Sequence, residues 1–434
     1  MITTAFVKIW GKLVGAVAWD AKSQLGSFEY DPKFLDFGWD LAPLKMPIEA
    51  GAKIYSFPTL RPGRNSIYDT FKGLPGLLAD MLPDKYGNQL IEVWLAQQGR
   101  APDSMNPVEK LCFIGSRGMG ALEFEPSQMK VRKTAYKIEV SSLVEISQRM
   151  LQQREKFQTN LAKDEEKAML DILKIGTSAG GARPKAVIAY NSKTSEVRSG
   201  QANAPKGFEH WLIKLDGVSD AQFGKSTGYG RVEMAYYLMA IDCGIDMMES
   251  RLLEEHGRAH FMTKRYDREG GATRHHVQTW CGMNHFDFNE MASYSYEQLF
   301  QTMRALGLDY QEAEQMFTRM VFNVLARNCD DHTKNFSFRM IKDKEWTLTP
   351  AYDICHAYDP QSIWVSQHAL SINGKRKNQT KEDFMKVAKS MNIKKAPAII
   401  KDIYSKVQNW ESYANQTGVD INIKKMIKES FIEV

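Results

Sequence analysis

Residues 328–338 read NCDDHTKNFSF and place two acids, a histidine, a lysine and an asparagine between two apolar blocks. The block before them, MFTRMVFNVLA, has apolar residues at helical spacing, and the short block after them, FSF, is typical of a strand. One interpretation is a solvated turn between a helix and a strand. The other is that these polar groups hold something charged.

The composition is that of a soluble globular protein, with 43% apolar and 25% charged residues. At 434 residues the chain is too long for one ordinary core, so two or three domains are expected. No apolar run approaches the roughly 18 residues that span a bilayer, and the N-terminus lacks the order of a signal peptide. We therefore expect a cytoplasmic protein with no membrane partner.

Net charge and cysteine content argue against several functions. A net charge of +5 is too mild to indicate a nucleic-acid partner. The five cysteines are scattered without a C-x-x-C pair, so they predict neither a zinc site nor a redox pair. The basic excess is concentrated in residues 374–397, where a helix would place its lysines opposite Phe384, Val387 and Ala388. A solvated helix face is the favoured interpretation.

The order of patterns along the chain predicts an α+β fold in three parts. Residues 1–125 read as short strands and turns with a helix near the middle, which indicates a small, mostly β N-terminal subdomain. A polar, proline-marked stretch between Glu125 and Ser142 indicates a boundary. Residues 140–270 are expected to form a mixed α/β lobe, and residues 271–434 an all-helical lobe.

Several stretches predict individual elements. AFVKIWGKLVGAVAWD (5–20) alternates apolar residues about Gly11, as a hairpin does. KAVIAY (185–190), HWLIKL (210–215) and AHFMTKRYDR (259–268) are typical of strands, and GRVEMAYYLMAIDCG (230–244) has the apolar spacing of a helix. KLCFIGSRGMGALEFEP (110–126) reads as a tight turn into a strand. The glycines of GSRGMG (115–120) suggest phosphate binding, but no strong helix start follows them, so a structural turn is favoured.

The spacing of polar groups in the opening stretch matches a known chemistry. Asp330 stands five residues before Asn335, as in a kinase catalytic loop, where the Asp orients the acceptor hydroxyl and the Asn holds magnesium. Downstream, Asp353 ends the stretch WTLTPAYD and is a candidate for a second magnesium carboxylate. Mg²⁺ prefers oxygen ligands, which an amide and a carboxylate supply.

Other requirements of phosphoryl transfer have candidates as well. Lys214 lies on a predicted strand and Glu233 on the next predicted helix, as a phosphate-binding lysine and its acid would. TSAGGARPK (177–185) offers backbone N–H groups and Lys185, although it matches neither common glycine-rich phosphate pattern. Each feature alone has an ordinary structural explanation. Their shared order along the chain favours phosphoryl transfer.

These residues give the chain a specific resemblance to the HipA family of serine/threonine protein kinases, the toxins of bacterial HipBA toxin–antitoxin pairs. The matching stretches include TSAGGARPKAVI, WLIKL, VEMAYYLMAIDCGI, KRYDR, DDHTKNFSF and LTPAYDI, in the family's order. GKLVGAVAWD, LADMLPDKYG and IGSRGMGALEF extend the resemblance over the first hundred or so residues. It implies a protein-kinase-like fold and magnesium-dependent transfer of the ATP γ-phosphate to a protein.

The resemblance also implies a role for each position. Asp330 is the expected catalytic residue, Asn335 and Asp353 the metal ligands, and Ser178 the autophosphorylated serine, whose modification is expected to inactivate the kinase. The expected ATP-binding residues are Gly180, Gly181, Ala182, Arg183, Pro184, Lys185, Lys214, Lys264, Arg265, Tyr266, His332, Lys334, Asn335, Tyr352 and Asp353. The segment from Lys264 to Tyr266 is expected to pass the adenine as a hinge, although Lys264 stands where a better-known family pattern has an acid. Pro184 removes one backbone donor from the loop.

The family implies partners that the residues themselves do not reveal. The expected substrate is an aminoacyl-tRNA synthetase, glutamyl-tRNA synthetase foremost, whose phosphorylation would slow translation and growth. The expected partner is a small DNA-binding HipB-like antitoxin, which would mediate most contact with DNA. Two alternatives stay open: a small-molecule kinase, for which the first 125 residues would lack a purpose, and a co-repressor that acts chiefly through its antitoxin on DNA.

Overall fold

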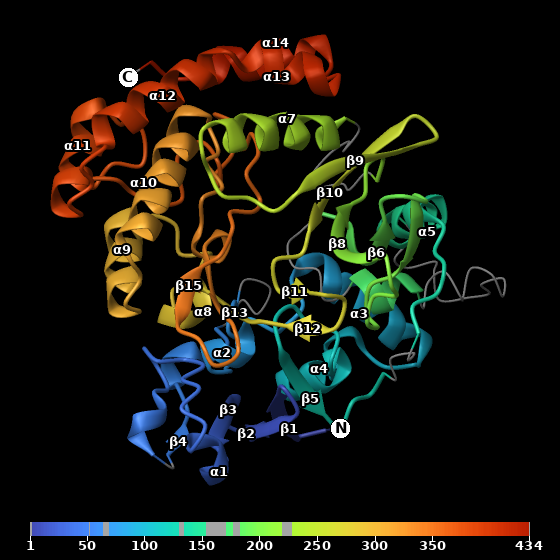
Figure 1. Cartoon of the computed structure of the whole chain (residues 1–434). Helices are drawn as coiled ribbons and strands as arrows, with labels where there is room; N and C mark the ends of the chain where they lie inside the picture. The colour runs from blue at the N-terminus through green and yellow to red at the C-terminus, as the bar shows by residue number, and fades with distance from the viewer. Residues whose placement is uncertain are drawn as a thin grey trace. The chain divides into compact units, whose positions relative to one another are not determined.

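The computed structural model describes residues 2–51, 53–63, 69–129, 134–152, 171–176, 183–218 and 228–433 (Figure 1). The chain divides into two compact units. Unit 1 comprises Met1–Gly230, Arg251–Val277 and Ile341–Asp343. Unit 2 comprises Arg231–Ser250, Gln278–Met340 and Lys344–Val434.

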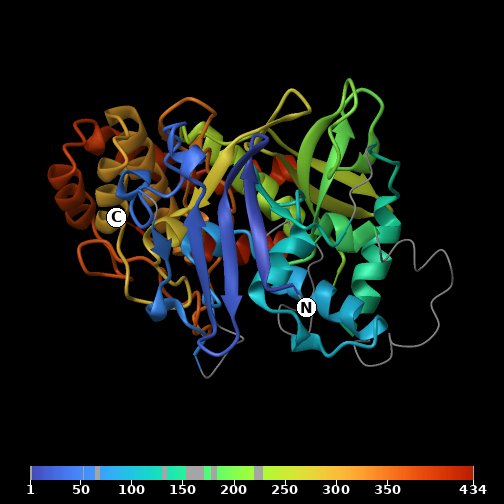
Figure 2. The same cartoon turned by 90° about the horizontal axis from the view of Figure 1, so that it is seen from below.

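Unit 1 begins with an antiparallel five-stranded sheet in the order β4-β3-β2-β1-β5, whose first three strands lie side by side in Figure 2. The strands are β1 Thr4–Ile9, β2 Lys12–Asp20, β3 Leu25–Tyr30, β4 Ile54–Tyr55 and β5 Leu122–Glu125. The hairpin predicted about Gly11 is confirmed. Trp10 and Gly11 both have positive φ, 47° and 75°, as a two-residue turn requires when its twist matches that of the strands.

The helices of unit 1 are short and pack on its two sheets. They are α1 Pro32–Leu35, α2 Gly76–Ala79, α3 Lys85–Gln97, α4 Pro107–Ile114 and α5 Val140–Gln152, with 3-10 turns η1 Ile48–Ala50, η2 Pro58–Leu60 and η4 Pro102–Ser104. Asn106 caps α4 by accepting from the Glu109 backbone N–H, and Pro107 occupies the first turn, where it needs no hydrogen-bond donor.

A second sheet of five strands has the order β7-β6-β8-β10-β9. The strands are β6 Lys185–Asn191, β7 Glu196–Ser199, β8 Glu209–Lys214, β9 Ser250–Glu255 and β10 Arg258–Lys264. The predicted strands at 185–190, 210–215 and 259–268 are thus confirmed in kind. Val187 and Ile213 of this sheet share a core with Tyr86 and Leu90 of α3 and with Ile146 of α5. A small hairpin, β11 Arg268–Glu269 and β12 Thr273–Arg274, follows β10.

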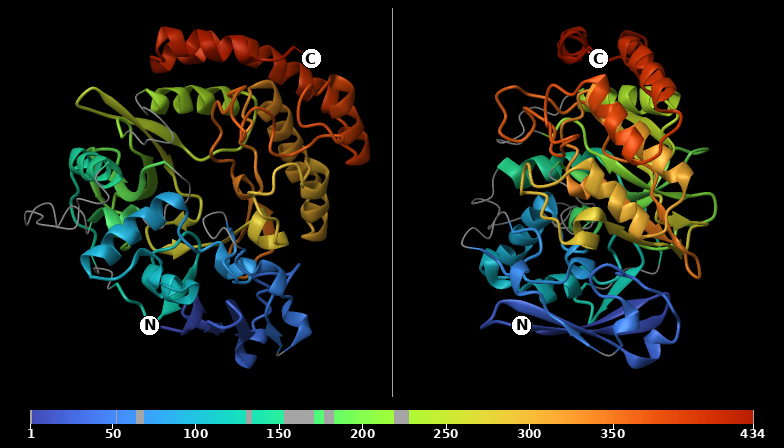
Figure 3. Two further views of the ribbon diagram at one scale, coloured as in Figure 1. Left: turned by 180° about the vertical axis from the view of Figure 1, so that it is seen from behind. Right: turned by 90° about the vertical axis from the view of Figure 1, so that its left-hand side faces the viewer.

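Unit 2 is mainly helical. Its helices are α8 Trp280–Asn284, α9 Tyr296–Ala305, α10 Tyr310–Leu325, α11 Lys381–Ser390, α12 Ala396–Gln408, α13 Trp410–Thr417 and α14 Ile421–Ser430, joined by most of α7 Tyr229–Asp242. Unit 2 also contains a 3-10 turn, η5 Thr333–Asn335, and the strands β14 Ser337–Met340 and β15 Trp346–Leu348. Strand β13 His276–Thr279 begins in unit 1 and ends in unit 2. Figure 3 shows the C-terminal helices in red.

Helix α10 is the rigid base of unit 2. It begins with a capping box, in which Asp309 accepts from the Glu312 backbone N–H and Glu312 accepts from the Asp309 backbone N–H, each at 3.0 Å. Every residue from Met316 to Leu325 is buried. Because α9 and α12 both pack against it, the end of α10 is fixed on several sides.

The predicted fold class is confirmed, and the predicted helix at 230–244 is α7, with Val232, Tyr236 and Met239 fully buried. Two details differ from the prediction. The C-terminal lobe is mostly rather than entirely helical, because β14 and β15 pair within it. Residues 110–114, predicted as part of a turn into a strand, belong to helix α4.

Two smaller expectations concern surfaces. Phe384, Val387 and Ala388 are buried on α11, so the predicted apolar face opposite the lysines of residues 374–397 is confirmed. Within the described ranges, none of the helices has both the length and the apolar character needed to cross a bilayer.

Candidate active site

The polar stretch that follows α10 is held by backbone hydrogen bonds. Arg327 has a positive φ of 55°, which turns the chain away from the helix axis. The Asn328 backbone N–H then donates to the Asn323 carbonyl at 2.9 Å, and the Cys329 backbone N–H donates to the Ala357 carbonyl at 3.0 Å. The next residues therefore project from a fixed base.

The structure brings three predicted site residues into one turn. The Asp330 side chain is 53% exposed, and its carboxylate Oδ1 lies 3.8 Å from His332 Nε2. The Asn335 Nδ2 donates to the Asp330 backbone carbonyl at 2.6 Å, which closes the turn across five residues. The side chain of Asp330 is left facing solvent, where an acceptor hydroxyl can reach it.

Asp331 has the opposite environment, with a fully buried side chain. Its Oδ2 accepts from the Tyr296 hydroxyl at 2.8 Å and lies 3.0 Å from His368 Nδ1, and its Oδ1 accepts from the Ala369 backbone N–H at 2.7 Å. This hydrogen-bond network extends to α10, because Asn323 Nδ2 donates to the Tyr296 hydroxyl at 3.0 Å. Asp331 thus ties the turn to α9, α10 and the segment at 368–369.

The charges in this buried network control the protonation of its members. Burial alone lowers the pKa of His368, but the Asp331 carboxylate outweighs it by charge and hydrogen bond and raises that pKa to about 10. Burial and the same carboxylate raise the pKa of Tyr296 well above its ordinary value. His368 is therefore an imidazolium ion at neutral pH, paired with Asp331.

A second segment of unit 2 brings Asp353 to the same turn. The Tyr352 hydroxyl donates to the Lys334 backbone carbonyl at 2.7 Å and also hydrogen-bonds the Ser337 hydroxyl. Asp353, the next residue, has a positive φ of 52°, a conformation that non-glycine residues adopt rarely and often at functional sites. Tyr352 therefore links the segment that carries Asp353 to the turn that carries Asn335.

The donor atoms of Asn335 and Asp353 are of the type that magnesium prefers. Asn335 uses its amide nitrogen to bond the Asp330 carbonyl, so its amide oxygen is the atom presented to a ligand. The Asp353 carboxylate is a second candidate oxygen donor. Among the described residues, no three acids, histidines or cysteines gather into a metal cluster. Two protein ligands suffice for Mg²⁺, which commonly keeps waters and substrate phosphates as its other ligands.

Lys334, the remaining predicted residue of the turn, shares an aromatic neighbour with His332. Lys334 Nζ lies 4.8 Å from the centroid of the Phe288 ring, and the His332 ring lies 5.2 Å from the same ring. The ring of Phe288 thus holds a cation and an imidazole on one side of the turn.

Unit 1 places the two predicted lysines directly opposite each other. In the antiparallel register of β6 and β8, Lys185 is the cross-strand partner of Lys214. Directly opposed side chains lie on the same face, and like charges in that position repel each other. Lys185 is also 95% buried. Glu233, the predicted acid, is buried on α7 and belongs to unit 2.

Only part of the predicted phosphate loop is described. Ser178, Gly180, Gly181 and Ala182 lie outside the described residues. The Arg183 guanidinium stacks 4.2 Å from the centroid of the Tyr229 ring, and the Pro184 carbonyl accepts from the Leu215 backbone N–H at 2.9 Å.

The predicted adenine segment, Lys264 to Tyr266, has another structural role for its charged side chains. Lys264 forms an ion pair with Glu209, and Arg265 binds both carboxylate oxygens of Asp267 at 2.9 and 2.7 Å. The Arg265 side chain is 2% exposed. The side chain of Arg265 is therefore engaged in an ion pair, whereas its backbone N–H donates to the His210 carbonyl at 2.9 Å.

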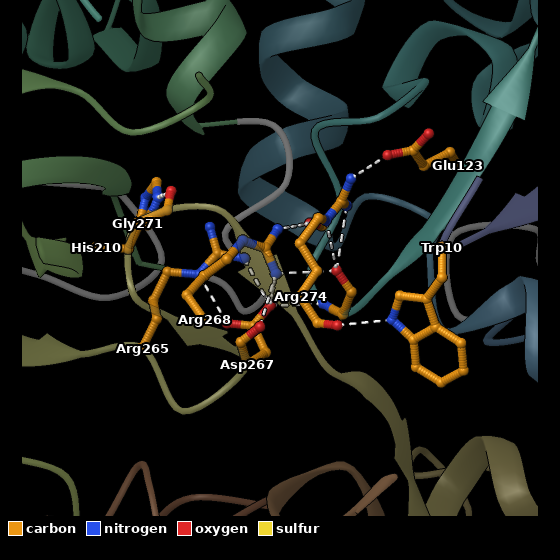
Figure 4. A network of polar contacts seen from close by, with 10 residues as sticks. Trp10, Glu123, His210, Arg265, Asp267, Arg268, Gly271 and Arg274 are labelled. Carbon is orange, nitrogen blue, oxygen red and sulfur yellow. Dashed lines mark hydrogen bonds and ion pairs between the residues drawn. The ribbon is translucent and has the colours of Figure 1, made fainter. Parts of the chain in front are cut away.

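Asp267 is the centre of a buried network, shown in Figure 4. Arg268 Nη1 donates to Asp267 Oδ2 at 2.6 Å and to the Gly120 carbonyl at 2.9 Å. The Gly120 backbone N–H donates to Asp267 Oδ2 at 2.6 Å, and Arg274 adds further bonds to the Gly120 carbonyl. Burial opposes ionisation of Asp267, but Arg265 and Arg268 outweigh it and lower the pKa of the carboxyl below its usual range.

This network explains the glycine-rich stretch GSRGMG. Its backbone carbonyls and one N–H are bound by the arginines and by Asp267, as the favoured structural interpretation requires. Gly120 has a φ of 76°, and an added Cβ would lie 3.2 Å from the Val277 backbone nitrogen. The glycine is needed for this conformation and for the close approach of the backbone.

Sequence reasoning missed the residues that hold Asp331. Tyr296 and His368 lie 35 and 37 residues from it along the chain, and no spacing rule connects them. Asn323 did carry a signal, because it is a polar residue within the buried stretch MFTRMVFNVLA. Phe288 was also missed.

The chain has a kinase-like α+β fold, and comparison with known proteins gives its family. Residues 5–125 match the HipA N-terminal domain, and residues 177–411 match the HipA-like C-terminal domain. The chain belongs to the HipA family. The curated proteins contain no match to this sequence.

The solved structure of a HipA protein agrees with this assignment at the level of fold. The HipA structure from a complex of Shewanella oneidensis HipA, HipB and operator DNA has a TM-score of 0.63 at 16% sequence identity, covering 99% of this chain and 100% of that one. The Helicobacter pylori proinflammatory kinase CtkA has a TM-score of 0.33 at 14% identity, covering 56% of this chain and 94% of that one. The likeness to HipA shows that the chain has the HipA fold.

Proposed function

We propose that this protein is an ATP- and magnesium-dependent serine/threonine protein kinase that acts as the toxin of a toxin–antitoxin module. The observation that carries the proposal is the turn at 330–335. Asp330 has an exposed carboxylate, and the Asn335 amide nitrogen donates to the Asp330 backbone carbonyl. Tyr352 links the segment that carries Asp353 to this turn. This is the arrangement that phosphoryl transfer to a hydroxyl needs.

Each residue then has a defined task. Asp330 accepts a hydrogen bond from the acceptor hydroxyl, orients it toward the γ-phosphate and takes its proton. Asn335 and Asp353 hold Mg²⁺, which when bound neutralises the charge on the phosphates. His332, Lys334 and Tyr352 line the nucleotide site. Their contacts to Phe288 and to one another fix their positions.

The other residues of the proposal are assigned to the phosphates and to the adenine. Lys185 and Lys214 bind phosphate oxygens, and their opposed positions on β6 and β8 favour this role. Arg183, Pro184 and the backbone of Gly180 to Ala182 complete the phosphate loop. Lys264 to Tyr266 pass the adenine, with contacts from the backbone, because the Arg265 side chain is bound to Asp267.

Substrate and partner follow from family membership. The proposed substrate is an aminoacyl-tRNA synthetase, glutamyl-tRNA synthetase by resemblance. The proposed partner is a HipB-like antitoxin through which the protein meets DNA, in keeping with the complex in which Shewanella oneidensis HipA was solved. The division into residues 1–125, 140–270 and 271–434 is part of the same proposal.

Autophosphorylation of Ser178 is proposed as the inactivating event. A phosphate there adds about −1.5 to −2 charges beside groups meant for the phosphates of ATP. Because the loop cannot readily cover ATP and present its own serine, the modification takes place between molecules. Mass spectrometry of active protein should find phosphate on Ser178, at a rate that rises with protein concentration. Full activity of Ser178-phosphorylated protein would refute the inactivation.

Thermal unfolding with and without Mg-ATP tests the site itself. A ligand that binds only the folded protein raises its melting temperature, so Mg-ATP should stabilise the wild type. Asp353→Ala should lose most of this increase. Asp402→Ala, on α12 with a side chain 52% exposed, is the matched control and should retain it. An undiminished increase in Asp353→Ala would remove Asp353 from the nucleotide site.

A further inference from the structure

A loop of unit 2, residues 358–367, presents two adjacent large apolar side chains to solvent. Ile363 is 72% exposed and Trp364 is 38% exposed. No other large apolar residue among the exposed ones of the described chain is as exposed as Ile363. Adjacent apolar side chains on the surface indicate an interaction site more often than isolated ones do.

Both ends of this loop are hydrogen-bonded to the turn that carries Asp330. At the first end, the Ala357 backbone N–H donates to the Arg327 carbonyl and the Ala357 carbonyl accepts from the Cys329 backbone N–H, each at 3.0 Å. At the second end, the Ala369 backbone N–H donates to Asp331 Oδ1 at 2.7 Å and to the Cys329 carbonyl at 3.1 Å. The loop is therefore attached on both sides of Asp330.

The loop is internally ordered, so its apolar side chains are held outward. The Ser362 Oγ accepts from the backbone N–H groups of Trp364 and Val365 at 3.1 and 3.3 Å. Asp359 Oδ1 accepts from the Gln361 backbone N–H at 2.9 Å. These side-chain bonds turn the backbone on both sides of Ile363 and leave its side chain outside.

The length of the loop limits how far its tip lies from Asp330. Six residues separate Ala357 from Ile363, and an extended chain spans at most about 3.4 Å per residue. Ile363 therefore lies within about 20 Å of the loop's anchor. A substrate segment with its hydroxyl at Asp330 covers that distance in about six residues.

We propose that residues 358–367, here called the docking loop, bind an apolar side chain of the protein substrate within about six residues of the acceptor Ser or Thr. The inference rests on the proposed kinase function and specifies the substrate sequence that it selects. An aliphatic or aromatic side chain packed on Ile363 and Trp364 removes apolar surface of both partners from water, which favours binding. Because both ends of the docking loop are hydrogen-bonded next to Asp330, a side chain bound there lies near the acceptor hydroxyl.

A positional-scanning library of serine peptides provides the test. Six positions on either side of the serine are varied, and labelled Mg-ATP reports phosphorylation. The wild type should favour apolar residues at one or more of these positions. The double variant Ile363→Ser with Trp364→Ser should lose that preference and raise the KM for the preferred peptide about tenfold or more, with its melting-temperature increase from Mg-ATP retained. Ile421→Ser, 64% exposed on α14 of the same unit, should behave as the wild type.

Three other outcomes would contradict the inference, and each points to a different explanation. If the wild type phosphorylates peptides without apolar preference, or the double variant keeps the preference, the docking loop does not select the substrate and the kinase function stands. If the wild type labels neither peptides nor lysate proteins, both proposals fail. If light scattering shows that the double substitution changes the oligomeric state, the loop is a contact between copies of this chain.

Discussion

At the residue scale, Asp330 and Asp331 show how neighbouring acids acquire different tasks. The first has a half-exposed carboxylate, and the second has three hydrogen-bond partners and no exposed surface. A reactive carboxylate needs access to substrate, whereas a buried one must be fully satisfied to be tolerated. The position of Asp330 therefore depends on Asp331.

The first prediction separates these tasks by stability. Asp331→Asn removes the negative partner of the His368 imidazolium and leaves a buried charge uncompensated, which costs about 3–5 kcal/mol of unfolding free energy. Asp330→Asn changes an exposed group and should alter stability by no more than about 0.5 kcal/mol. Urea unfolding of both variants measures the difference. Equal stability of the two would mean that the Asp331 network does not hold the turn.

The second prediction concerns pH. The pKa of His368 is raised to about 10 in the folded protein, against about 6.5 for an ordinary histidine. Its pairing with Asp331 therefore contributes stability that is fully present below pH 6.5 and is lost as pH rises toward 10. The stability difference between the wild type and His368→Gln should shrink over that range. A difference that is constant from pH 6.5 to 9.5 would contradict the charged state of His368.

How far the site was predictable depends on sequence separation. The Asp330 and Asn335 pair was found because both residues lie in one turn, and the structure joins them by a hydrogen bond. The Asp331 partners were not found, because Tyr296 and His368 reach it only through tertiary packing. Arg265 was expected at the nucleotide, and no local pattern revealed that its side chain is committed to Asp267.

At the element scale, the β11–β12 hairpin and the turn at 118–120 are held together by charge rather than by apolar packing. Gly118 and Gly120 carbonyls accept from Arg268, and Asp267 compensates the arginines. A short hairpin of two residues per strand has little apolar surface of its own to bury.

The third prediction is that Asp267→Asn lowers the unfolding free energy by about 3–5 kcal/mol, since it leaves buried guanidinium groups without their counter-charge. The matched control is Glu269→Gln on β11, whose side chain is 72% exposed beside His275 and which should cost less than about 1 kcal/mol. Thermal or urea unfolding compares the two. Similar losses in both variants would show that the network does not stabilise unit 1.

Elements were predicted best where the apolar period was long and clear, as for α7 and for β1 with β2. Helix α4 was missed because its residues VEKLCFI, apolar except for Glu109 and Lys110, are buried nearly all round and show no periodic face. Asn106 and Pro107 marked its start, and these capping signals would have corrected the prediction.

At the scale of the whole molecule, buried neutral histidines set the response to acid. Burial lowers the pKa values of His210, His276 and His356 to about 4 each. The unfolded chain therefore binds more protons than the folded one between about pH 4 and 6.5, and stability must fall as the pH drops through this range. Burial raises the pKa of Asp40 to about 6, so this carboxyl group acts in the opposite direction. Its single proton does not offset the protons of the three histidines. The melting temperature should fall from pH 7 to pH 4.5; an unchanged or rising value would contradict these assignments.

Transfer of labelled γ-phosphate from ATP to lysate proteins tests the central claim most directly. Wild-type protein with magnesium should label a protein on Ser or Thr. Asp330→Asn, with its melting temperature unchanged, should label it roughly 100- to 10,000-fold more slowly, because the amide cannot take the hydroxyl proton. Equal labelling by Asp330→Asn, or no labelled protein with the wild type, would contradict the assignment of this site to phosphoryl transfer.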